Sequence, residues 1–166
     1  MSHSIGTTRV EDVMNTVSLT VDPGCRMDKV ARLLDEHDVN AAPVVDQRGV
    51  FLGIITSHDV VEFESTRAEM QTELNHGYQY NLARYGSGSP LRIPGQHFNE
   101  AGFNMTRTVK TADPADPVSS AARKMCSSHV HHIVVLDSEE KPVGILSSLD
   151  ILGLILGEPV CRSPRC

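Results

Sequence analysis

Two short stretches of the sequence place a hydroxyl residue three positions before an aspartate. The first runs from Thr56 to Asp59, and the second runs from Ser147 to Asp150. At the start of a helix such a pair caps free backbone amides, and its carboxylate complements the positive end of the helix dipole. The same geometry suits a phosphate, because exposed amides donate hydrogen bonds. The spacing by itself favours helix capping, and the two roles are compatible.

Cysteine and histidine side chains cluster just before the second of these stretches, at Cys126, His129, His131 and His132. Thiolate and imidazole are preferred zinc ligands. Consecutive residues of a strand point to opposite faces, however, so His131 and His132 are not expected to share a metal ion. We expect these histidines to face solvent or a phosphate. No Ser-His-Asp or Cys-His spacing indicates nucleophilic catalysis, so we expect no catalytic residue. We also expect no metal site and no resident cofactor.

Both hydroxyl–aspartate stretches belong to a longer internal repeat. Residues 53–59 read GIITSHD and residues 144–150 read GILSSLD, 91 positions later. The same offset pairs Met14 with Met105 and Asp46 with Asp137 without a gap. An identity that keeps register over so long a stretch indicates two copies of one structural unit.

The apolar patterns of the two copies agree with the repeat. Each copy contains a helical stripe at positions i, i+3, i+4 and i+7. The stripes are Met27, Val30, Ala31 and Leu34 in the first copy and Val118, Ala121, Ala122 and Met125 in the second. Two short apolar runs separated by turn residues follow each stripe, at residues 42–45 and 50–55 and again at 133–136 and 143–146. We therefore expect an α/β protein with two strand-helix-strand-strand-helix units.

The two copies resemble the cystathionine-β-synthase (CBS) domain family, over residues 10–61 and 103–157. The resemblance rests on the Gly-apolar-apolar-Thr/Ser-x-x-Asp ending of both copies and on the APVVD run at residues 42–46. Residues 130–137 also resemble the matching stretch of the AMP-sensing subunits of AMP-activated kinase. The resemblance implies a tandem pair, called a Bateman module, with two βαββα units packed by a pseudo-twofold axis. A long insertion between the units departs from the family pattern.

The resemblance also implies an adenosine-type ligand in clefts between the units. In the family the hydroxyl residue faces the phosphate and the aspartate accepts from the ribose hydroxyls, which corresponds here to Thr56 with Asp59 and to Ser147 with Asp150. The base would contact the backbone of the segments that open each unit and nearby apolar walls. These are Thr16, Val17 and Ser18; Thr108, Val109 and Lys110; and the walls Ala42, Pro43, Ile133 and Val134. An ordinary edge strand with core side chains is the plain alternative for these positions. The candidates for phosphate neutralisation are His58, His131, His132 and Lys110, with Arg84 and Arg92 if the insertion folds over a cleft.

Along the chain we expect a first unit at residues 1–61 and a second unit at residues 104–157. Residues 62–103 are expected to extend the preceding helix to about residue 77 and then to form a long connection without regular structure. That connection contains Tyr78, Tyr80 and Tyr85, which are candidates to pack over a base or a neighbouring subunit. The connection is a candidate lid, and an inert solvated insertion is the plain alternative. Residues 158–166 are expected to form a flexible tail.

The amino-acid composition limits the classes of partner and the cellular location that we expect. The chain has 166 residues, 15 Lys and Arg against 21 Asp and Glu, a net charge of −6 and a pI of about 5.7. This charge is opposite to that of a nucleic-acid-binding surface. No apolar run approaches the roughly 20 residues of a membrane span, and the N-terminus lacks the pattern of a secretory signal. We therefore expect a cytoplasmic protein whose four cysteines are thiols.

These patterns favour a regulatory module that binds AMP, ADP, ATP or S-adenosylmethionine and modulates a partner protein that the sequence does not identify. The alternative is a structural interaction module with empty clefts. In either case we expect a homodimer, formed through apolar positions of the last helix of each unit. These positions are Val60, Val61 and Phe63 in the first unit and Ile151, Leu152, Leu154 and Ile155 in the second.

Overall fold

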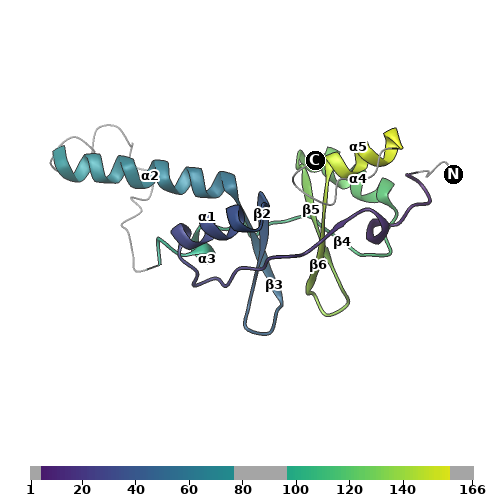
Figure 1. The fold of residues 1–166 in the computed structure, drawn as a ribbon, viewed down its shortest axis with the longest axis horizontal. Coiled ribbons are helices and arrows are strands. Elements are labelled where there is room, and N and C mark those ends of the chain that lie inside the picture. Colours follow the sequence, from purple (N-terminus) through teal and green to yellow (C-terminus); the bar gives the residue numbers. More distant parts are fainter. Residues whose placement is uncertain (1–4, 77–96, 158–166) are drawn as a thin grey trace.

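The computed structural model describes residues 5–76 and 97–157, which form two units side by side (Figure 1). Each unit is a β-hairpin covered by two helices. The first unit contains α1 (Met27–Glu36), β2 (Ala41–Val45), β3 (Phe51–Thr56) and α2 (Ser57–His76). The second contains α4 (Val118–Ser128), β5 (His132–Leu136), β6 (Pro142–Ser147) and α5 (Ser148–Leu156). The expected order of elements in both repeats is confirmed, as is the extension of the first unit's last helix.

The two hairpins have the same register. Ala41 lies opposite Thr56 in the first, and His132 lies opposite Ser147 in the second, 91 positions later in both strands. A parallel strand flanks each hairpin: β4 (Thr111–Ala112) pairs with β5, and Val21 forms the equivalent bridge with Val44. The chain therefore forms two βαββα units related by a pseudo-twofold axis.

The predicted helical stripes fill the cores of the units. Met27, Val30 and Leu34 of α1 pack against the first hairpin, while Val118, Ala121 and Met125 of α4 pack against the second. Full burial of one such aliphatic side chain contributes about 1.5–3 kcal/mol. Both helices are followed by a residue in the left-handed region, Asp38 with φ of 54° and His129 with φ of 53°. Aspartate and histidine tolerate this conformation better than most residues, so both copies make the same turn into their hairpin.

The segment that opens each repeat packs on the opposite unit. Strand β1 (Asn15–Thr16) pairs with β6 of the second unit, where Asn15 lies opposite Ile145. In the reciprocal position Thr106 forms a bridge with Ile54 of the first unit. Figure 1 shows the N-terminal segment, in purple, crossing from the second unit to the first. The sheet of the second unit, in the order β1-β6-β5-β4, therefore includes a strand from the first repeat.

Two short helical turns continue this exchange. The 3-10 helix η1 (Val10–Asp12) places Val10 in the core of the second unit, while α3 (Ala101–Asn104) places Ala101 in the core of the first. The Val10 N–H donates to the Asp116 carbonyl at 2.9 Å, and the Ala101 N–H donates to the Cys25 carbonyl at 2.7 Å. Unit boundaries at residues 61 and 104 follow the repeat along the sequence. In three dimensions, η1 packs in the core of the second unit and α3 packs in the core of the first.

The end of the long connection is ordered against the first unit. The ring of Phe98 lies 5.3 Å from the ring of Phe63, centroid to centroid, and the Met27 N–H donates to the Asn99 carbonyl at 2.9 Å. Residues 97–103, which we expected to lack regular structure, include most of the helical turn α3 (Ala101–Asn104). The remainder of the expected connection, with Tyr78, Tyr80, Tyr85, Arg84 and Arg92, lies outside the described residues, as do residues 158–166.

Each crossing point requires a glycine. A Cβ atom on Gly53 would lie 2.6 Å from the Thr106 carbonyl oxygen and 3.0 Å from the Met105 sulfur. A Cβ atom on Gly144 would instead meet only the side chain of Met14, with Cγ 2.8 Å away, so Met14 would have to shift. The two hairpins also contact each other directly, through the Phe51 N–H bond to the Glu140 carbonyl at 3.0 Å and through Ala41, Ile54 and Val134.

Gly53→Ala is expected to lower the free energy of unfolding by about 2 kcal/mol, because the added methyl group meets backbone that cannot move aside. Urea unfolding followed by circular dichroism measures the effect. Gly24→Ala is the matched control, since the nearest atom to its Cβ is a carboxylate oxygen of Asp22, 3.2 Å away on a side chain that can move. Equal stability of the two variants would contradict the close crossing.

Candidate functional site

Both hydroxyl–aspartate pairs lie where a strand passes directly into a helix. Strand β3 ends at Thr56 and α2 begins at Ser57, while β6 ends at Ser147 and α5 begins at Ser148. The Asp59 Oδ2 atom accepts from the Thr56 N–H at 2.7 Å and from its Oγ1 at 2.6 Å. The Asp150 Oδ2 atom accepts from the Ser147 N–H and Oγ, both at 2.6 Å. The predicted N-terminal helix caps are therefore confirmed in both repeats.

These caps already use the hydroxyl protons. Thr56 and Ser147 each donate to their own aspartate, and each hydroxyl oxygen accepts the aspartate N–H, at 3.3 Å and 3.2 Å. A phosphate presents only acceptors when ionised, so it needs donors. To donate to a phosphate, either hydroxyl must first leave its carboxylate. The carboxylates, by contrast, can accept further hydrogen bonds through their second oxygen.

The second oxygen is where the two aspartates differ. Asp150 Oδ1 accepts from the side-chain amide Nδ2 of Asn15 at 3.0 Å, and Asp150 is only 6% exposed. Asp59 is half-buried, and its Oδ1 has no hydrogen-bond partner within residues 5–76 and 97–157. Thr106 occupies the position in the first unit that corresponds to Asn15. Among the described residues, Oδ1 of Asp150 thus has a protein donor and Oδ1 of Asp59 has none.

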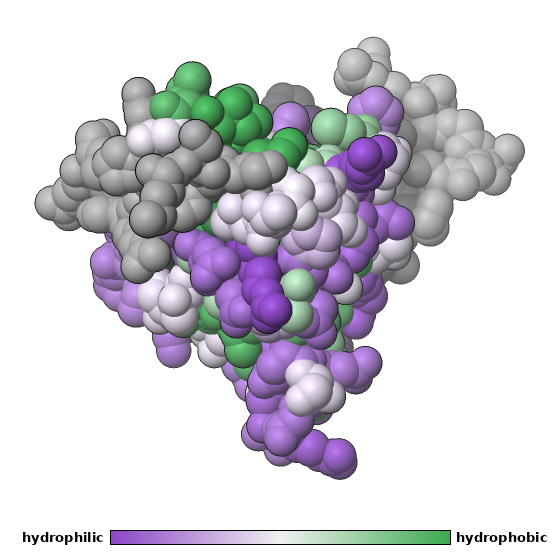
Figure 2. All heavy atoms as spheres, turned by 90° about the vertical axis from the view of Figure 1, so that its right-hand side faces the viewer, coloured by the Kyte–Doolittle hydropathy of each residue, from purple (hydrophilic) through white to green (hydrophobic). Residues whose placement is uncertain are grey.

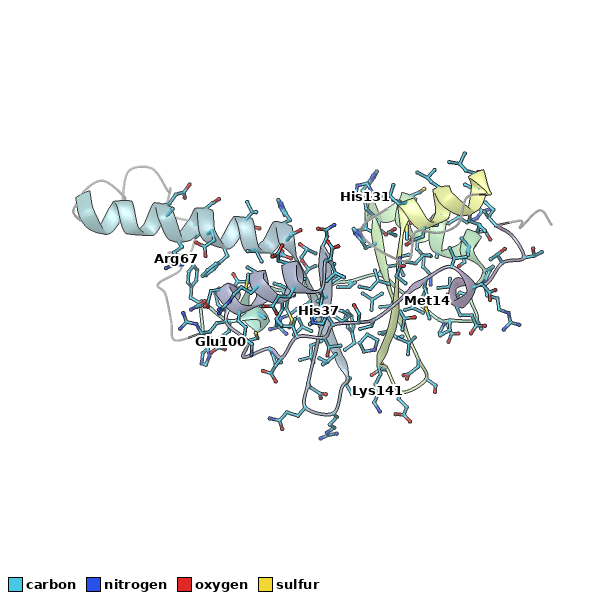
Figure 3. All side chains as sticks on the ribbon, viewed as in Figure 1. Met14, His37, Arg67, Glu100, His131 and Lys141 are labelled. Atoms are coloured by element: carbon cyan, nitrogen blue, oxygen red, sulfur yellow. The ribbon has the colours of Figure 1, made fainter. Side chains whose placement is uncertain are left out.

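The histidines next to the second cap lie beside the carboxylate. His132 is directly across the hairpin from Ser147, so the two side chains share one face of the sheet. The carbonyl of His131 accepts from the Ser148 N–H at 3.0 Å, which holds the start of β5 against the start of α5 (Figure 3). His58 is exposed on the first turn of α2. The structure thus brings His131 and His132 to the Asp150 cap, and His58 to the Asp59 cap.

The environment of His132 lowers its pKa below the usual value. Partial burial of the ring is the main cause, and the charge of His131 acts in the same direction. Asp150 opposes both by favouring the charged imidazolium. The side chain as a whole is nevertheless exposed, so water still reaches one side of the ring.

The opening segments lie beside the caps, as the exchange of strands requires. Thr16 is exposed opposite Gly144, and the Val17 N–H donates to the Val143 carbonyl at 3.2 Å. On the other side, Thr108 and Lys110 are exposed, and the Lys110 carbonyl accepts from the Val134 N–H at 3.4 Å. The side chain of Val109 packs against the contact between the units. Part of the backbone of these segments is therefore already paired with the hairpin strands.

All four of the expected apolar walls are deeply buried. Ala42 and Ile133 are both 0% exposed and lie in the cores of their own units. Pro43 is fully buried, and Val134 packs between the units with Ala41 and Ile54. The side chains of Ala42 and Ile133 therefore point away from any cleft, because alternate residues of a strand face opposite sides. Ala41 and Val134 are the strand residues at the contact between the units.

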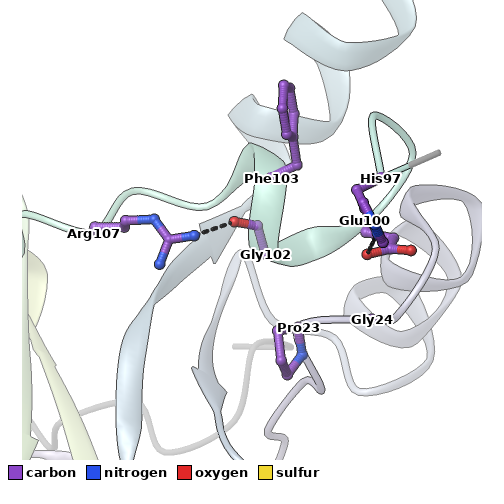
Figure 4. A pocket seen from close by; sticks show the side chains of 7 residues that line it. All are labelled: Pro23, Gly24, His97, Glu100, Gly102, Phe103 and Arg107. Atoms are coloured by element: carbon purple, nitrogen blue, oxygen red, sulfur yellow. Dashed lines mark hydrogen bonds and ion pairs between the residues drawn. The ribbon is translucent and has the colours of Figure 1, made fainter. Parts of the chain in front are cut away.

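A surface depression of about 540 Å³ lies elsewhere, on the first unit (Figure 4). Its lining includes His97, Glu100 and Phe103 from the end of the connection and Pro23 from the turn before α1. His97 and Glu100 pair at 2.9 Å, and Arg107 donates to the Gly102 carbonyl at 2.8 Å. These polar groups are satisfied within the protein. We therefore place the candidate site at the carboxylates, where Oδ1 of Asp59 has no partner among the described residues.

Asn15 was missed by sequence reasoning. The repeat aligns Asn15 with Thr106, and asparagine is a poor strand residue. The available signal for a special role of Asn15 was therefore its difference from Thr106 at the same place in the repeat. Among the described residues, no group of three or more histidine, cysteine, aspartate or glutamate side chains is arranged to hold a metal ion. In the same part of the chain, no helix combines the length and apolar character that crossing a membrane needs.

Comparison with known proteins gives a consistent result. The sequence model of the CBS domain matches residues 10–65 and 101–157. The CBS domain pair of protein MJ0100, solved in complex with 5′-methylthioadenosine and S-adenosyl-L-methionine, is 27% identical with a TM-score of 0.67, covering 90% of this chain and 97% of that one. The CBS domain of a membrane protein from Sphaerobacter thermophilus is 30% identical with a TM-score of 0.63, covering 90% of this chain and 89% of that one.

Among curated relatives, an L-aspartate semialdehyde sulfurtransferase from Methanocaldococcus jannaschii is 26% identical over 91% of this chain. A homoserine O-acetyltransferase from Methanohalobium evestigatum is 24% identical over 93% of it. The alignments cover 24% and 26% of these relatives, so the chain spans about a quarter of their length.

His132→Gln is expected to reduce the loss of stability at acid pH. The unfolded chain has a histidine pKa near 6.5 and the folded chain a lower one, so on acidification the unfolded state binds the proton first. The contribution of His132 to stability is thus present above pH 6.5 and is lost as the pH falls through the folded pKa. Urea midpoints at about pH 7.5 and 5.5 measure this, with exposed His37→Gln as the control. An unchanged pH dependence in His132→Gln would refute it.

Proposed function

The chain belongs to the CBS domain family, and from this we propose that it is a regulatory module that binds an adenosine derivative between its two units. AMP, ADP, ATP and S-adenosylmethionine are the ligands of this class that we consider. On binding, the ligand biases the conformation or assembly of the module, and a separate partner protein reads that change. The module itself catalyses no reaction in this proposal.

The observation that carries the proposal is a carboxylate at each place where the repeats cross. Asp59 follows Ile54, which is bridged by Thr106 of the second repeat, and Asp150 follows Ile145, which is paired with Asn15 of the first. Each carboxylate thus follows a strand that pairs with a segment of the other repeat, and Asp150 contacts that segment directly through Asn15. A carboxylate offers only acceptors, which suits the two donor hydroxyls of a ribose, and the nearby helix N-terminus favours negative charge.

The relatives support a ligand of this class and a regulatory role. The domain pair of MJ0100, similar along nearly all of its length, was solved with two adenosine derivatives. In the sulfurtransferase and acetyltransferase relatives the matched segment is about a quarter of the protein. A segment of that proportion is consistent with a module that accompanies other domains and modulates them.

Assembly into a homodimer is part of the proposal. Exposed apolar side chains gather on α5, at the upper edge of the face shown in Figure 2. They are Leu149, Leu152, Ile155 and Leu156, exposed by 51–74%, with Val61 of α2 exposed by 63%. Patches of this kind usually mark contacts with another protein. Two residues that we expected in the dimer contact, Phe63 and Ile151, are instead buried in the unit cores.

A structural module with empty clefts is the second candidate function, and the apolar surface of α5 is the observation that favours it. Both candidates predict a dimer, so oligomeric state does not separate them. Ligand binding does separate them, because a ligand that binds only the native state raises its stability.

An adenosine ligand at 100 times its dissociation constant is expected to stabilise the protein by about 2.7 kcal/mol. A thermal-shift panel of AMP, ADP, ATP, S-adenosyl-L-methionine and 5′-methylthioadenosine tests this. The double variant Asp59→Ala/Asp150→Ala is expected to lose the shift, since each lost hydrogen bond to a charged group costs about 1.5–3 kcal/mol. Guanosine and inorganic phosphate serve as control compounds. If no adenosine compound shifts the transition, the structural candidate is the correct one.

Light scattering at micromolar concentrations is expected to give twice the chain mass of 18.1 kDa. Leu152→Glu is expected to weaken the dimer by about 2 kcal/mol or more, because it buries a charge without a partner. Glu36→Lys, on the exposed end of α1, is the control for a changed surface charge. A monomer at all concentrations in the unaltered protein would rule out the dimer.

A further inference from the structure

The two clefts differ at a single acceptor oxygen. We propose that the clefts are unequal in the free protein: Asp59 offers a ribose diol an Oδ1 atom with no partner among the described residues, whereas Asn15 already donates to Oδ1 of the buried Asp150 and must move aside before a nucleoside reaches that oxygen. This inference rests on the proposed function and adds to it the order in which the sites fill.

The hydrogen bonds of the two carboxylates support the difference directly. In both caps Oδ2 is held by the backbone and hydroxyl of the residue three positions earlier. Oδ1 of Asp150 additionally accepts from Asn15 Nδ2 at 3.0 Å. The corresponding oxygen of Asp59 has no hydrogen-bond partner in the described part of the chain.

Burial points the same way. Asp150 is 6% exposed, so a ligand reaches its Oδ1 only if a protein group moves aside. Asp59 is half-buried, and its Oδ1 atom is not among the buried side-chain atoms that lack a partner. The ribose hydroxyls can therefore meet Asp59 without breaking a contact within the described residues.

The cause is the identity of one side chain. Asn15 and Thr106 occupy equivalent crossing positions, opposite Ile145 and Ile54. The backbone is thus the same on both sides of the pseudo-twofold axis. Asparagine carries its two amide donors one atom further from the backbone than threonine carries its hydroxyl. Asn15 reaches across to the carboxylate, while the side chain of Thr106 is exposed.

The Asn15 contact also links the two repeats. Asn15 belongs to β1 of the first repeat and Asp150 to α5 of the second, 135 residues apart. A nucleoside in the second cleft would replace this link with a contact of its own, so only that cleft exchanges an internal contact for ligand. Occupation of the second cleft would therefore change the attachment of β1, and occupation of the first would not.

The test uses 5′-methylthioadenosine, which has no phosphate and so does not draw on His131 and His132. Isothermal titration of the unaltered protein is expected to give one stronger site and a second site about 10- to 100-fold weaker, the range for losing a hydrogen bond to a charged group. Asn15→Thr, which copies the other repeat, is expected to strengthen the weaker site by a similar factor. Asp59→Asn is expected to remove the stronger site.

Asn15→Ser is a second variant that frees Asp150 if Asn15→Thr folds poorly, and Thr106→Asn should weaken the first site by transferring the contact. A measurement without ligand is the Asn15 side-chain amide resonance, which should shift in Asp150→Asn and stay unchanged in Asp59→Asn. Two equal sites in the unaltered protein, or no effect of the Asn15 variants on a weak site, would overturn the inequality alone. Absence of binding by every adenosine compound would overturn the proposed function and this inference with it.

Discussion

The close crossing of each opening segment over the other unit's last strand is the contact on which the remaining structure depends. Gly53 and Gly144 permit it, because a side chain at either position would meet Thr106 and Met105, or Met14. Because no side chain separates the two backbones there, the opening segment can pair with the strand as a β-ladder, with Asn15 opposite Ile145. Since the contact is made twice, separation of the units would expose both glycine crossings and the cores that Val10 and Ala101 complete.

The crossing also determines which groups lie beside the two helix caps. Each hairpin delivers its last residue, Thr56 or Ser147, to a helix start directly beside the crossing segment. In each cap the Oδ2 atom of the aspartate accepts hydrogen bonds from its own repeat. Whether the Oδ1 atom has a protein donor depends on the side chain that the other repeat places beside it. Two histidines, His131 and His132, lie next to the Asp150 cap, whereas His58 alone lies next to the Asp59 cap. Two units of one design thereby acquire different electrostatic surroundings.

The sequence by itself determined the units and their caps. The 91-residue offset, the helical stripes and the apolar runs predicted both βαββα units, and the structure has them with identical register. The pairing of Thr56 with Asp59 and of Ser147 with Asp150 is local, spanning three residues, so spacing alone predicts it. The family resemblance likewise follows from residues that are contiguous in each repeat, and the match to the CBS domain confirms it.

Only the tertiary structure decided which repeat each opening segment serves. The two copies are alike, so residues 10–16 and 101–106 find an equivalent surface on either unit. The 91-residue offset is the same whether each opening segment packs on its own unit or on the other one. The burial of Ala42 and Ile133 was likewise hidden, because fully buried strands lack the polar alternation that assigns faces. The Asn15 contact with Asp150 joins residues 135 positions apart, and it exists because folding brings one repeat's first strand beside the other repeat's last helix.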